Sequence, residues 1–182
     1  MIKEIPTLEN ERVKLLPLTL ENYMLIWPIA QQPELVKYSP GDVESKQGLT
    51  NYVEKAIIAW EQKSAIPFLV FDKVTQTYAG TTRFMHIDWN NKTLHIGATW
   101  LGREFHGSGL NTHMKKLMLP YAFDKLGFEK IEFRIDARNT ASRKAVEKLG
   151  AVLEGVLRKN VYLEDGFKRD TCCYGILKEE YQ

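Results

Sequence analysis

Cysteine is scarce in this chain, which has two cysteines among its 182 residues. They are adjacent, Cys172 and Cys173, and neighbouring side chains of a strand point to opposite faces, so a disulfide between them would be strained. This excludes a disulfide-stabilised scaffold, and we expect two buried or half-buried thiols. A chain of this length can bury a full core without cross-links.

Long apolar runs and an excess of one charge are also missing. No stretch reaches the roughly 20 apolar residues of a membrane-spanning helix, and residues 1–7 lack the apolar centre of a signal peptide. The net charge of +2 favours no particular polyanion. We therefore expect a cytoplasmic protein that binds neither membranes nor nucleic acid. Because no interdomain linker or repeat is present, a single domain over residues 1–182 is expected.

Metal-ligand spacing is absent as well. The four histidines are His86, His95, His106 and His113. None has a second nitrogen, sulfur or carboxylate ligand in a recognisable motif, so we expect no metal site.

The most informative segment present is a glycine-containing loop between a predicted strand (residues 94–101) and a predicted helix (residues 112–126). The loop contains Gly107-Ser108-Gly109. Two glycines let the backbone turn its amides inward, and the first turn of a helix adds unpaired N–H groups and the positive end of its dipole. The loop therefore predicts a binding site for a polyphosphate, with a plain strand-to-helix turn as the alternative.

The same loop lacks what two common nucleotide sites require. No lysine follows the second glycine, as it does in a nucleoside-triphosphate loop, and no third glycine completes the dinucleotide fingerprint. Of the common polyphosphate ligands, this leaves a carrier molecule that contains a pyrophosphate and is neither a nucleoside triphosphate nor a dinucleotide.

The downstream segment carries strand and helix signals in order. Residues 130–136 alternate polar and apolar side chains, which is the period of a strand with one buried face. Asn139 is placed to cap a short helix over residues 140–149, and Gly150 is placed to end it.

The first half predicts two helices and several antiparallel strands. Thr19 caps the first helix and Pro28 ends it, while the second carries an apolar stripe from Leu49 to Trp60. Strands are expected at residues 11–16, 68–71, 78–87 and 94–101.

Taken together, these motifs resemble the GNAT superfamily of CoA-dependent N-acyltransferases. The resemblance lies in residues 96–101, 107–109, 139–142, 147–151, 155–158 and 165–174. The last two segments resemble the branch that contains the ribosomal-protein N-terminal acetyltransferases. Two positions depart from the family pattern, because His106 stands where glutamine or arginine is usual and Asn111 stands where glycine or alanine is usual.

The resemblance implies an α+β fold with a central mixed, mostly antiparallel twisted sheet, flanked by helices on both faces and splayed in the middle to hold CoA. It implies direct transfer of an acetyl group from acetyl-CoA, as cosubstrate, to a primary amine, first of all the α-amine of a protein or peptide. Two alternatives stay open: an acetyltransferase for a small amine such as a polyamine or an antibiotic, and a CoA-binding module without turnover. A homodimer is also left open.

By the same resemblance, the strand that ends at Trp100 and Leu101 pairs with the pantetheine arm and points a backbone N–H near Leu101 at the thioester oxygen. Asn139 hydrogen-bonds the CoA arm and Ser142 protonates the leaving thiolate, although both residues also suit ordinary helix capping. The pyrophosphate is expected on His106, Gly107, Ser108, Gly109, Leu110, Asn111 and Thr112.

The acceptor side is expected on segments that flank this cleft. An amine must be neutral to attack a thioester, so a general base is needed. Glu132, His86 and Asp88 are the candidates, although a solvated polar strand face would explain them equally well. Tyr38, beside the loop at Ser39, is expected to line the acceptor pocket together with His86 and Asp88.

Overall fold

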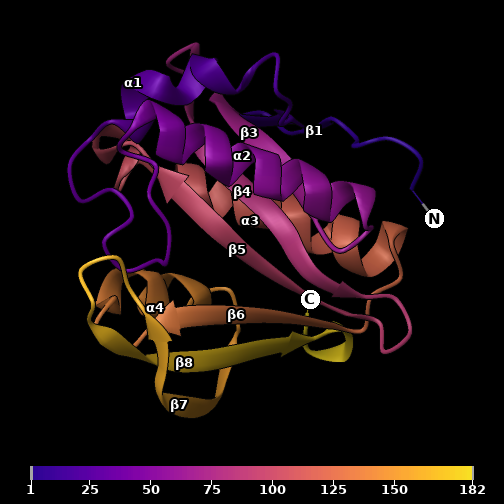
Figure 1. Ribbon diagram of the computed structural model, residues 1–182. Coiled ribbons are helices and arrows are strands. Elements are labelled where there is room, and N and C mark those ends of the chain that lie inside the picture. The colour runs from indigo at the N-terminus through magenta and orange to yellow at the C-terminus, as the bar shows by residue number, and fades with distance from the viewer. Residues whose placement is uncertain (1, 182) are drawn as a thin grey trace.

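The computed structural model describes residues 2–181. Within them the strands are β1 (Leu8–Glu9), β2 (Val13–Pro17), β3 (Ile66–Asp72), β4 (Thr77–Asp88), β5 (Thr93–Leu101), β6 (Lys130–Asp136), β7 (Val152–Tyr162) and β8 (Lys168–Leu177). They form one continuous sheet in the order β1-β2-β3-β4-β5-β6-β8-β7 (Figure 1). All neighbouring strands are antiparallel except β5 and β6. The prediction of a mixed, mostly antiparallel sheet is confirmed.

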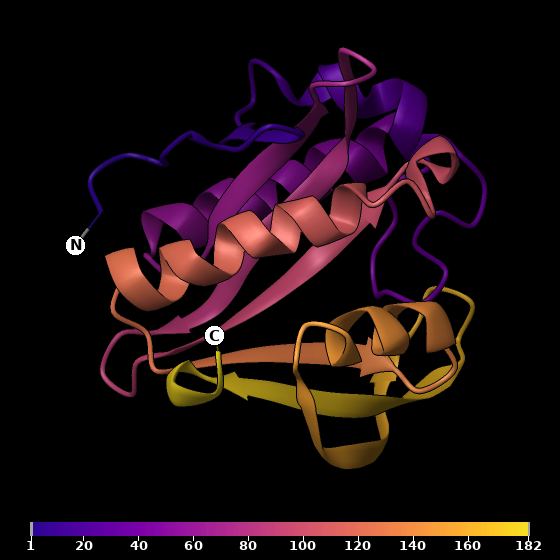
Figure 2. The same ribbon diagram turned by 180° about the vertical axis from the view of Figure 1, so that it is seen from behind.

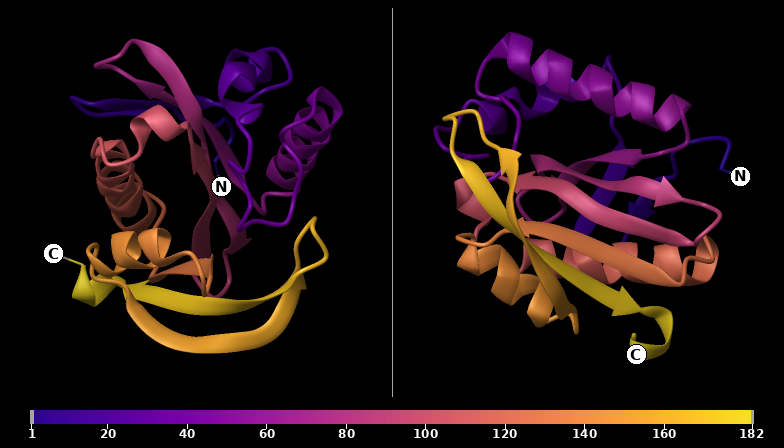
Figure 3. Two further views of the ribbon diagram at one scale, coloured as in Figure 1. Left: turned by 90° about the vertical axis from the view of Figure 1, so that its left-hand side faces the viewer. Right: turned by 60° about the horizontal axis from the view of Figure 1, so that its bottom comes forward.

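Helices cover both faces of this sheet. They are α1 (Trp27–Ala30), α2 (Lys46–Glu61), α3 (Leu110–Pro120) and α4 (Thr140–Glu147). The first two lie on one face and the last two on the other, as the views in Figures 1, 2 and 3 agree. None of the helices within residues 2–181 is both long and apolar enough to cross a membrane.

The predicted amphipathic helix is α2. It begins at the cap residue Ser45, whose hydroxyl oxygen accepts a hydrogen bond from the Gly48 N–H at 2.9 Å. Its buried stripe is Leu49, Val53 and Ala56. The spacing of these residues is that of one helix face, which packs on the sheet.

The first helix differs from the prediction. A 3₁₀ turn (Tyr23–Ile26) leads into α1, and Pro28 lies in the first turn of α1. Proline has no N–H, and the N–H groups of a first turn have no acceptor inside the helix, so proline suits a helix start. The prediction that Pro28 ends a helix begun at Thr19 was wrong.

The helix after the glycine loop is interrupted near its end. It begins two residues earlier than predicted, at Leu110, and a π-helical turn (Tyr121–Lys125) follows Pro120. In this turn the Leu126 N–H bonds to the Tyr121 carbonyl, five residues back, at 3.0 Å. Pro120 has no N–H to donate to the carbonyl one turn before it, so the helical hydrogen-bond ladder is already interrupted directly before this turn.

Strands β5 and β6 pair over three residues only. Their partners are Thr93 with Lys130, Leu94 with Ile131 and His95 with Glu132. Past this point β6 continues beside β8 and β5 beside β4, so a wedge opens between β5 and β6 (Figure 2). The predicted splay of the sheet is confirmed.

A β-bulge lies in β5 where the wedge opens. Arg83 pairs with Gly97 and Thr81 with Trp100, so one residue of β4 opposes two of β5. Ala98, inside the bulge, has a φ of 46°. Such a bulge bends a strand and re-aims its side chains.

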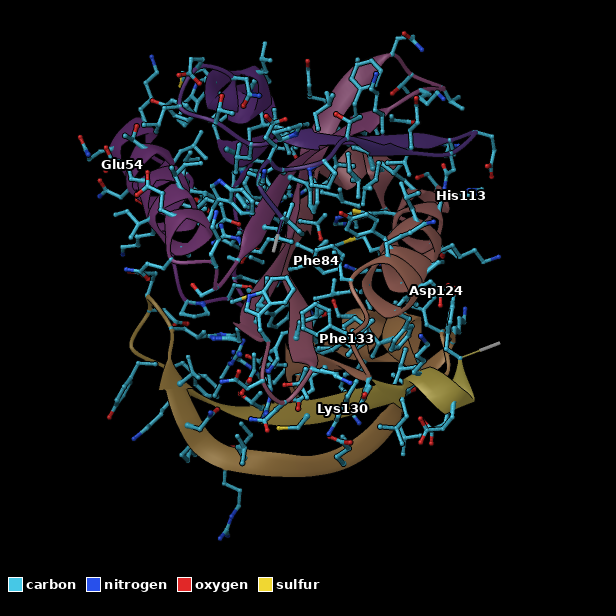
Figure 4. All side chains as sticks on the ribbon, turned by 90° about the vertical axis from the view of Figure 1, so that its right-hand side faces the viewer. Glu54, Phe84, His113, Asp124, Lys130 and Phe133 are labelled. Carbon is cyan, nitrogen blue, oxygen red and sulfur yellow. The ribbon has the colours of Figure 1, made fainter. Side chains whose placement is uncertain are left out.

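The core fills the space between the sheet and its helices. Phe84 of β4 is fully buried, in edge contact with Phe68 at 5.9 Å and stacked on Tyr121 at 6.3 Å between ring centres. Figure 4 shows Phe84 in the interior and Glu54 on the outer side of α2. This packing holds β4 against β3 and against the π-helical turn that follows α3.

Candidate active site

The glycine loop approaches α3 with its backbone uncovered. Gly107 and Gly109 have φ angles of 73° and 84°, a region that glycine adopts without strain. A Cβ atom added at either glycine would meet no heavy atom within 4 Å. The space beside both peptides is therefore open to a ligand.

Four amides of this loop are free to bind an anion. Within residues 106–112, four backbone N–H groups have no acceptor in the part of the chain that the structure describes. They belong to Gly107, Gly109, Asn111 and Thr112. The N–H groups of His106, Ser108 and Leu110 are already bonded within the loop. Of the seven residues expected at the pyrophosphate, four thus offer a free donor at the positive end of the α3 dipole.

Two side chains brace this loop. The His106 Nε2 atom lies 3.0 Å from the Leu101 carbonyl oxygen, and the Ser108 hydroxyl donates to the Phe105 carbonyl at 2.7 Å. The His106 ring thereby ties the loop to the end of β5, a role that the sequence did not indicate.

The N–H of Leu101 points into the wedge. Gly102 donates to the Ala79 carbonyl at 2.9 Å, and bonded and non-bonded pairs alternate along an antiparallel ladder. At the next pair, Leu101 with Gly80, the peptide groups of Leu101 therefore face away from β4. Because His106 occupies the carbonyl, the N–H is the group left for a ligand.

The start of α4 lies on the β6 side of the wedge, as its position directly after β6 requires. Asn139 Oδ1 accepts a hydrogen bond from the Ser142 N–H at 3.1 Å, so the predicted cap is confirmed. The Asn139 backbone N–H donates to the Asp136 carbonyl at 2.9 Å. Among the described residues, the Asn139 side-chain nitrogen Nδ2 and the Ser142 hydroxyl have no hydrogen-bond partner. Both groups are therefore free to contact a ligand in the wedge.

A cavity of about 400 Å³ opens on the α2 side of the wedge. Its walls come from the loop after α1, from Tyr52 of α2, from β4 and β5 and, across the wedge, from β6, β7 and β8. Its volume lies within the usual range for small-ligand sites. Trp100 forms part of the wall.

Of the three residues expected in the acceptor pocket, His86 lines this cavity. The Asp88 carboxylate instead accepts both the backbone and the side-chain N–H of Asn91, at 2.8 and 2.7 Å. The structure thus places Asp88 in the β4–β5 turn and outside the cavity wall. Tyr38 lies just behind the wall, with its carbonyl bonded by Arg169, and the residues that follow it form the wall.

His95 is a wall residue that sequence reasoning considered only as a metal ligand. Its Nε2 atom lies 3.3 Å from Glu132 Oε2, and its ring packs on His86 with 4.8 Å between ring centres. Burial lowers the pKa of His95 to about 4, so the imidazole is neutral near pH 7. The geometry assigns the ring proton to Nε2, facing Glu132, and leaves a lone pair on Nδ1.

Glu132 itself lies beside the cavity, behind His95. Its carboxylate is 2.8 Å from Arg134 and 3.6 Å from Lys130. Burial raises the pKa of Glu132, but its interaction with His95, the hydrogen bond and charge of Arg134 and the charge of Lys130 outweigh this and hold the pKa below its usual value. Glu132 is therefore ionised and placed to orient His95.

Lys115 of α3 is buried under the bulge of β5. It is 4% exposed, and its amine donates to Thr99 Oγ1 at 3.1 Å. Among the residues described, no carboxylate pairs with it, and burial lowers its pKa to about 7. The sequence contained a signal for the burial of Lys115. Met118 and Leu119, three and four residues later, lie on the same face of the helix and are apolar.

Comparison with known proteins identifies the family. The sequence model of the family described as acetyltransferase (GNAT) domain matches residues 12–152. The chain therefore belongs to the GNAT family and is an N-acetyltransferase.

Individual relatives agree with this assignment. Over 179 residues the chain is 28% identical to the uncharacterized N-acetyltransferase p20 of Bacillus licheniformis, covering 96% of this chain and 98% of p20. The microcin C7 self-immunity acetyltransferase MccE, solved with acetyl-CoA and AMP, is similar at a TM-score of 0.80 and 25% identity, over 92% of this chain and 93% of that one. The ribosomal-protein-S5-alanine acetyltransferase of Vibrio fischeri shares the fold, at a TM-score of 0.79 and 19% identity over 97% and 99% of the two chains.

Replacing Lys115 with methionine should stabilise the protein more at pH 7 than at pH 10. An unfolded lysine has a pKa of ~10.4, so between about pH 7 and pH 10 the unfolded chain holds a proton that the folded chain releases. Folding is penalised throughout this window, and the penalty fades as the pH rises through it. Urea titrations of parent and variant at both pH values measure the difference in free energy of unfolding.

Lys116→Met is the matched control, because Lys116 is the exposed neighbour on the same helix. It should show no such pH-dependent difference. A Lys115→Met effect of equal size at pH 7 and pH 10 would contradict the assigned burial of an amine with a lowered pKa.

Proposed function

We propose that the protein transfers the acetyl group of acetyl-CoA to a primary amine, namely the α-amine at the N-terminus of a peptide or protein. The observation that carries this proposal is the wedge between β5 and β6, which has free amides at the α3 end and a cavity on the α2 side. Membership of the GNAT family and the likeness to MccE, which was solved with acetyl-CoA, support the cosubstrate.

The groups around the wedge fit the parts of acetyl-CoA. The four free amides of the glycine loop suit the pyrophosphate. Past His95 one edge of β5 is unpaired, so the amides of the pantetheine arm can add to it as an extra strand would. From the opposite side, the side-chain nitrogen Nδ2 of Asn139 can donate to the same arm.

Each chemical demand then has a residue of this chain to meet it. His95 Nδ1 accepts a proton from the amine, directly or through a water, and the amine nitrogen forms the new C–N bond. The Leu101 N–H donates to the oxyanion of the tetrahedral intermediate. As the C–S bond breaks, the Ser142 hydroxyl gives a proton to the thiolate.

The cavity wall favours a peptide end over a polycation. No aspartate or glutamate belongs to the wall as far as the described residues form it. A polyamine or an aminoglycoside would bring several positive charges with no carboxylate to receive them. An α-amine has a pKa of ~8 and is partly neutral near pH 7, so a weak base such as His95 suffices for it.

Gly109→Val should weaken CoA binding at least tenfold. A valine side chain would occupy the open space beside the free amides and resist the positive φ, and one lost charge-assisted hydrogen bond costs about 1.5–3 kcal/mol. Calorimetric titration with CoA measures the change. Gly127→Val is the matched control, because Gly127 has a similar φ of 75° and equally open space but lies after α3. Unchanged CoA affinity in Gly109→Val would remove the loop from the binding site.

His95→Gln should lower kcat by about 10²–10⁴-fold, the range for a general base, and leave CoA affinity unchanged. His113→Gln is the control, because His113 pairs with Glu11 on the far side of α3 from the cavity. An unaltered kcat in His95→Gln, with a large loss in Glu132→Gln, would move the base to Glu132.

The acceptor assignment predicts faster release of CoA thiol with peptides than with polycations. Peptides with small or hydroxylated first residues are compared with spermidine and kanamycin at equal concentration. A polycation that outpaces every peptide would assign the protein to small amines. CoA binding without thiol release from any acceptor would favour the module without turnover.

A further inference from the structure

Arg83 is a buried cation without a counter-charge. It lies on β4 with 9% of its surface exposed, and its Nη2 atom is buried with no acceptor among residues 2–181. No aspartate or glutamate in that range forms an ion pair with it. Its guanidinium carbon stands 4.6 Å from the centre of the Tyr52 ring. An unpaired buried charge is costly, and this cost is offset if an anion binds there.

Trp100 brings a second unsatisfied donor to the same ring. Its Nε1 is also buried without an acceptor in the described part of the chain, and its ring centre lies 6.0 Å from that of Tyr52. Tyr52 and Trp100 form part of the cavity wall, as does Gly97, the cross-strand partner of Arg83. The two donors therefore flank one aromatic ring of the cavity.

A flexible side chain, that of Met85, forms the part of the cavity wall next to Arg83 along β4. Met85, two residues along β4, places its sulfur 2.9 Å from where a Cβ of Gly97 would lie, and Met85 is itself a wall residue. Methionine has several rotatable bonds and adapts its shape readily. Arg83 itself is not a wall residue, so a ligand in the cavity reaches its guanidinium only if side chains of the wall, such as Met85, rotate.

The surroundings are cationic as well. Arg134 and Arg169 line the cavity, and the acidic groups nearest to them are already occupied. Glu132 is shared by Arg134, Lys130 and His95, and Asp136 is held by two hydrogen bonds from the Arg138 side chain. Among residues 2–181, neither of these carboxylates nor any other forms an ion pair with Arg83.

We infer that the acceptor carries an anionic group, a carboxylate or a phosphate, within a few atoms of the amine that is acetylated, and that Arg83 and the Trp100 indole N–H bind this group. The inference rests on the proposed function and narrows its acceptor to acidic peptide N-termini. Arg83 offers a planar donor fork that suits either anion. The same contact would hold the amine in a fixed place relative to His95.

The direct test compares wild-type kcat/KM for pairs of peptides that differ only in charge. Peptides that begin Ser-Glu and Ser-Gln form one pair, and peptides that begin Ser-phosphoserine and Ser-Ser form the other. We expect at least a tenfold gain from the acidic group in one pair or both, and the larger gain identifies the anion. Equal rates within both pairs would overturn this inference and leave the proposed function standing. Thiol release from none of the four peptides would overturn the proposed function as well.

Two variants then test whether Arg83 and Trp100 bind the anionic group of the acceptor. Arg83→Met should reduce the acidic-to-neutral ratio of kcat/KM to nearly one. Trp100→Phe, which replaces the indole with a smaller ring that has no N–H donor, should reduce this ratio several-fold. Arg158→Met is the control, because Arg158 is exposed on β7 away from Tyr52, and it should retain the full ratio. Thermal melting shows whether each variant is folded. A folded Arg83→Met protein that keeps the wild-type ratio would overturn the role of Arg83.

Discussion

The short pairing of β5 with β6 is the constraint on which the rest of this structure depends. Three residue pairs join the two halves of the sheet, and past His95 one edge of β5 has no strand beside it. Backbone N–H and C=O groups in such a place need partners. The Leu101 carbonyl oxygen is paired with Nε2 of the His106 ring, while the Leu101 N–H faces the wedge. The fold thus leaves hydrogen-bonding capacity where a chain-like ligand can use it.

Several buried ionisable groups surround this wedge without full compensation. Lys115 lies under the bulge, His95 is kept neutral by burial, and Arg83 has no counter-charge within residues 2–181. Each of these costs stability, and such groups gather at functional sites because chemistry needs them in that state. The hydrophobic packing around Phe84 holds β4, the strand that carries Arg83. The stability of the core thus offsets the cost of burying these three ionisable groups, which the proposed acetyl transfer places around its site.

Local signals made much of the fold predictable. The alternation in β6 and the Asn139 cap depend on a few neighbouring residues, so the sequence alone indicates them. The resemblance to a family added the splay, which no local pattern encodes. Pro28 was misjudged because proline both ends and begins helices. Arg83 and His95 were missed because their burial arises from contacts with α2 and β6, distant in sequence. A turn at residues 90–92 was predictable from its two asparagines, and the place of Asp88 in it could have been found as well, since aspartate side chains commonly accept backbone N–H groups two or three residues later in turns.

The central claim is that one ligand, acetyl-CoA, spans the wedge from the glycine loop to the end of β5. Hydrogen–deuterium exchange of the backbone amides, with and without acetyl-CoA, tests this most directly. The account predicts that acetyl-CoA slows exchange both in residues 107–112 and at Leu101, while the β1–β2 edge is unaffected. Protection of neither segment, or protection confined to a surface away from the wedge, would contradict it.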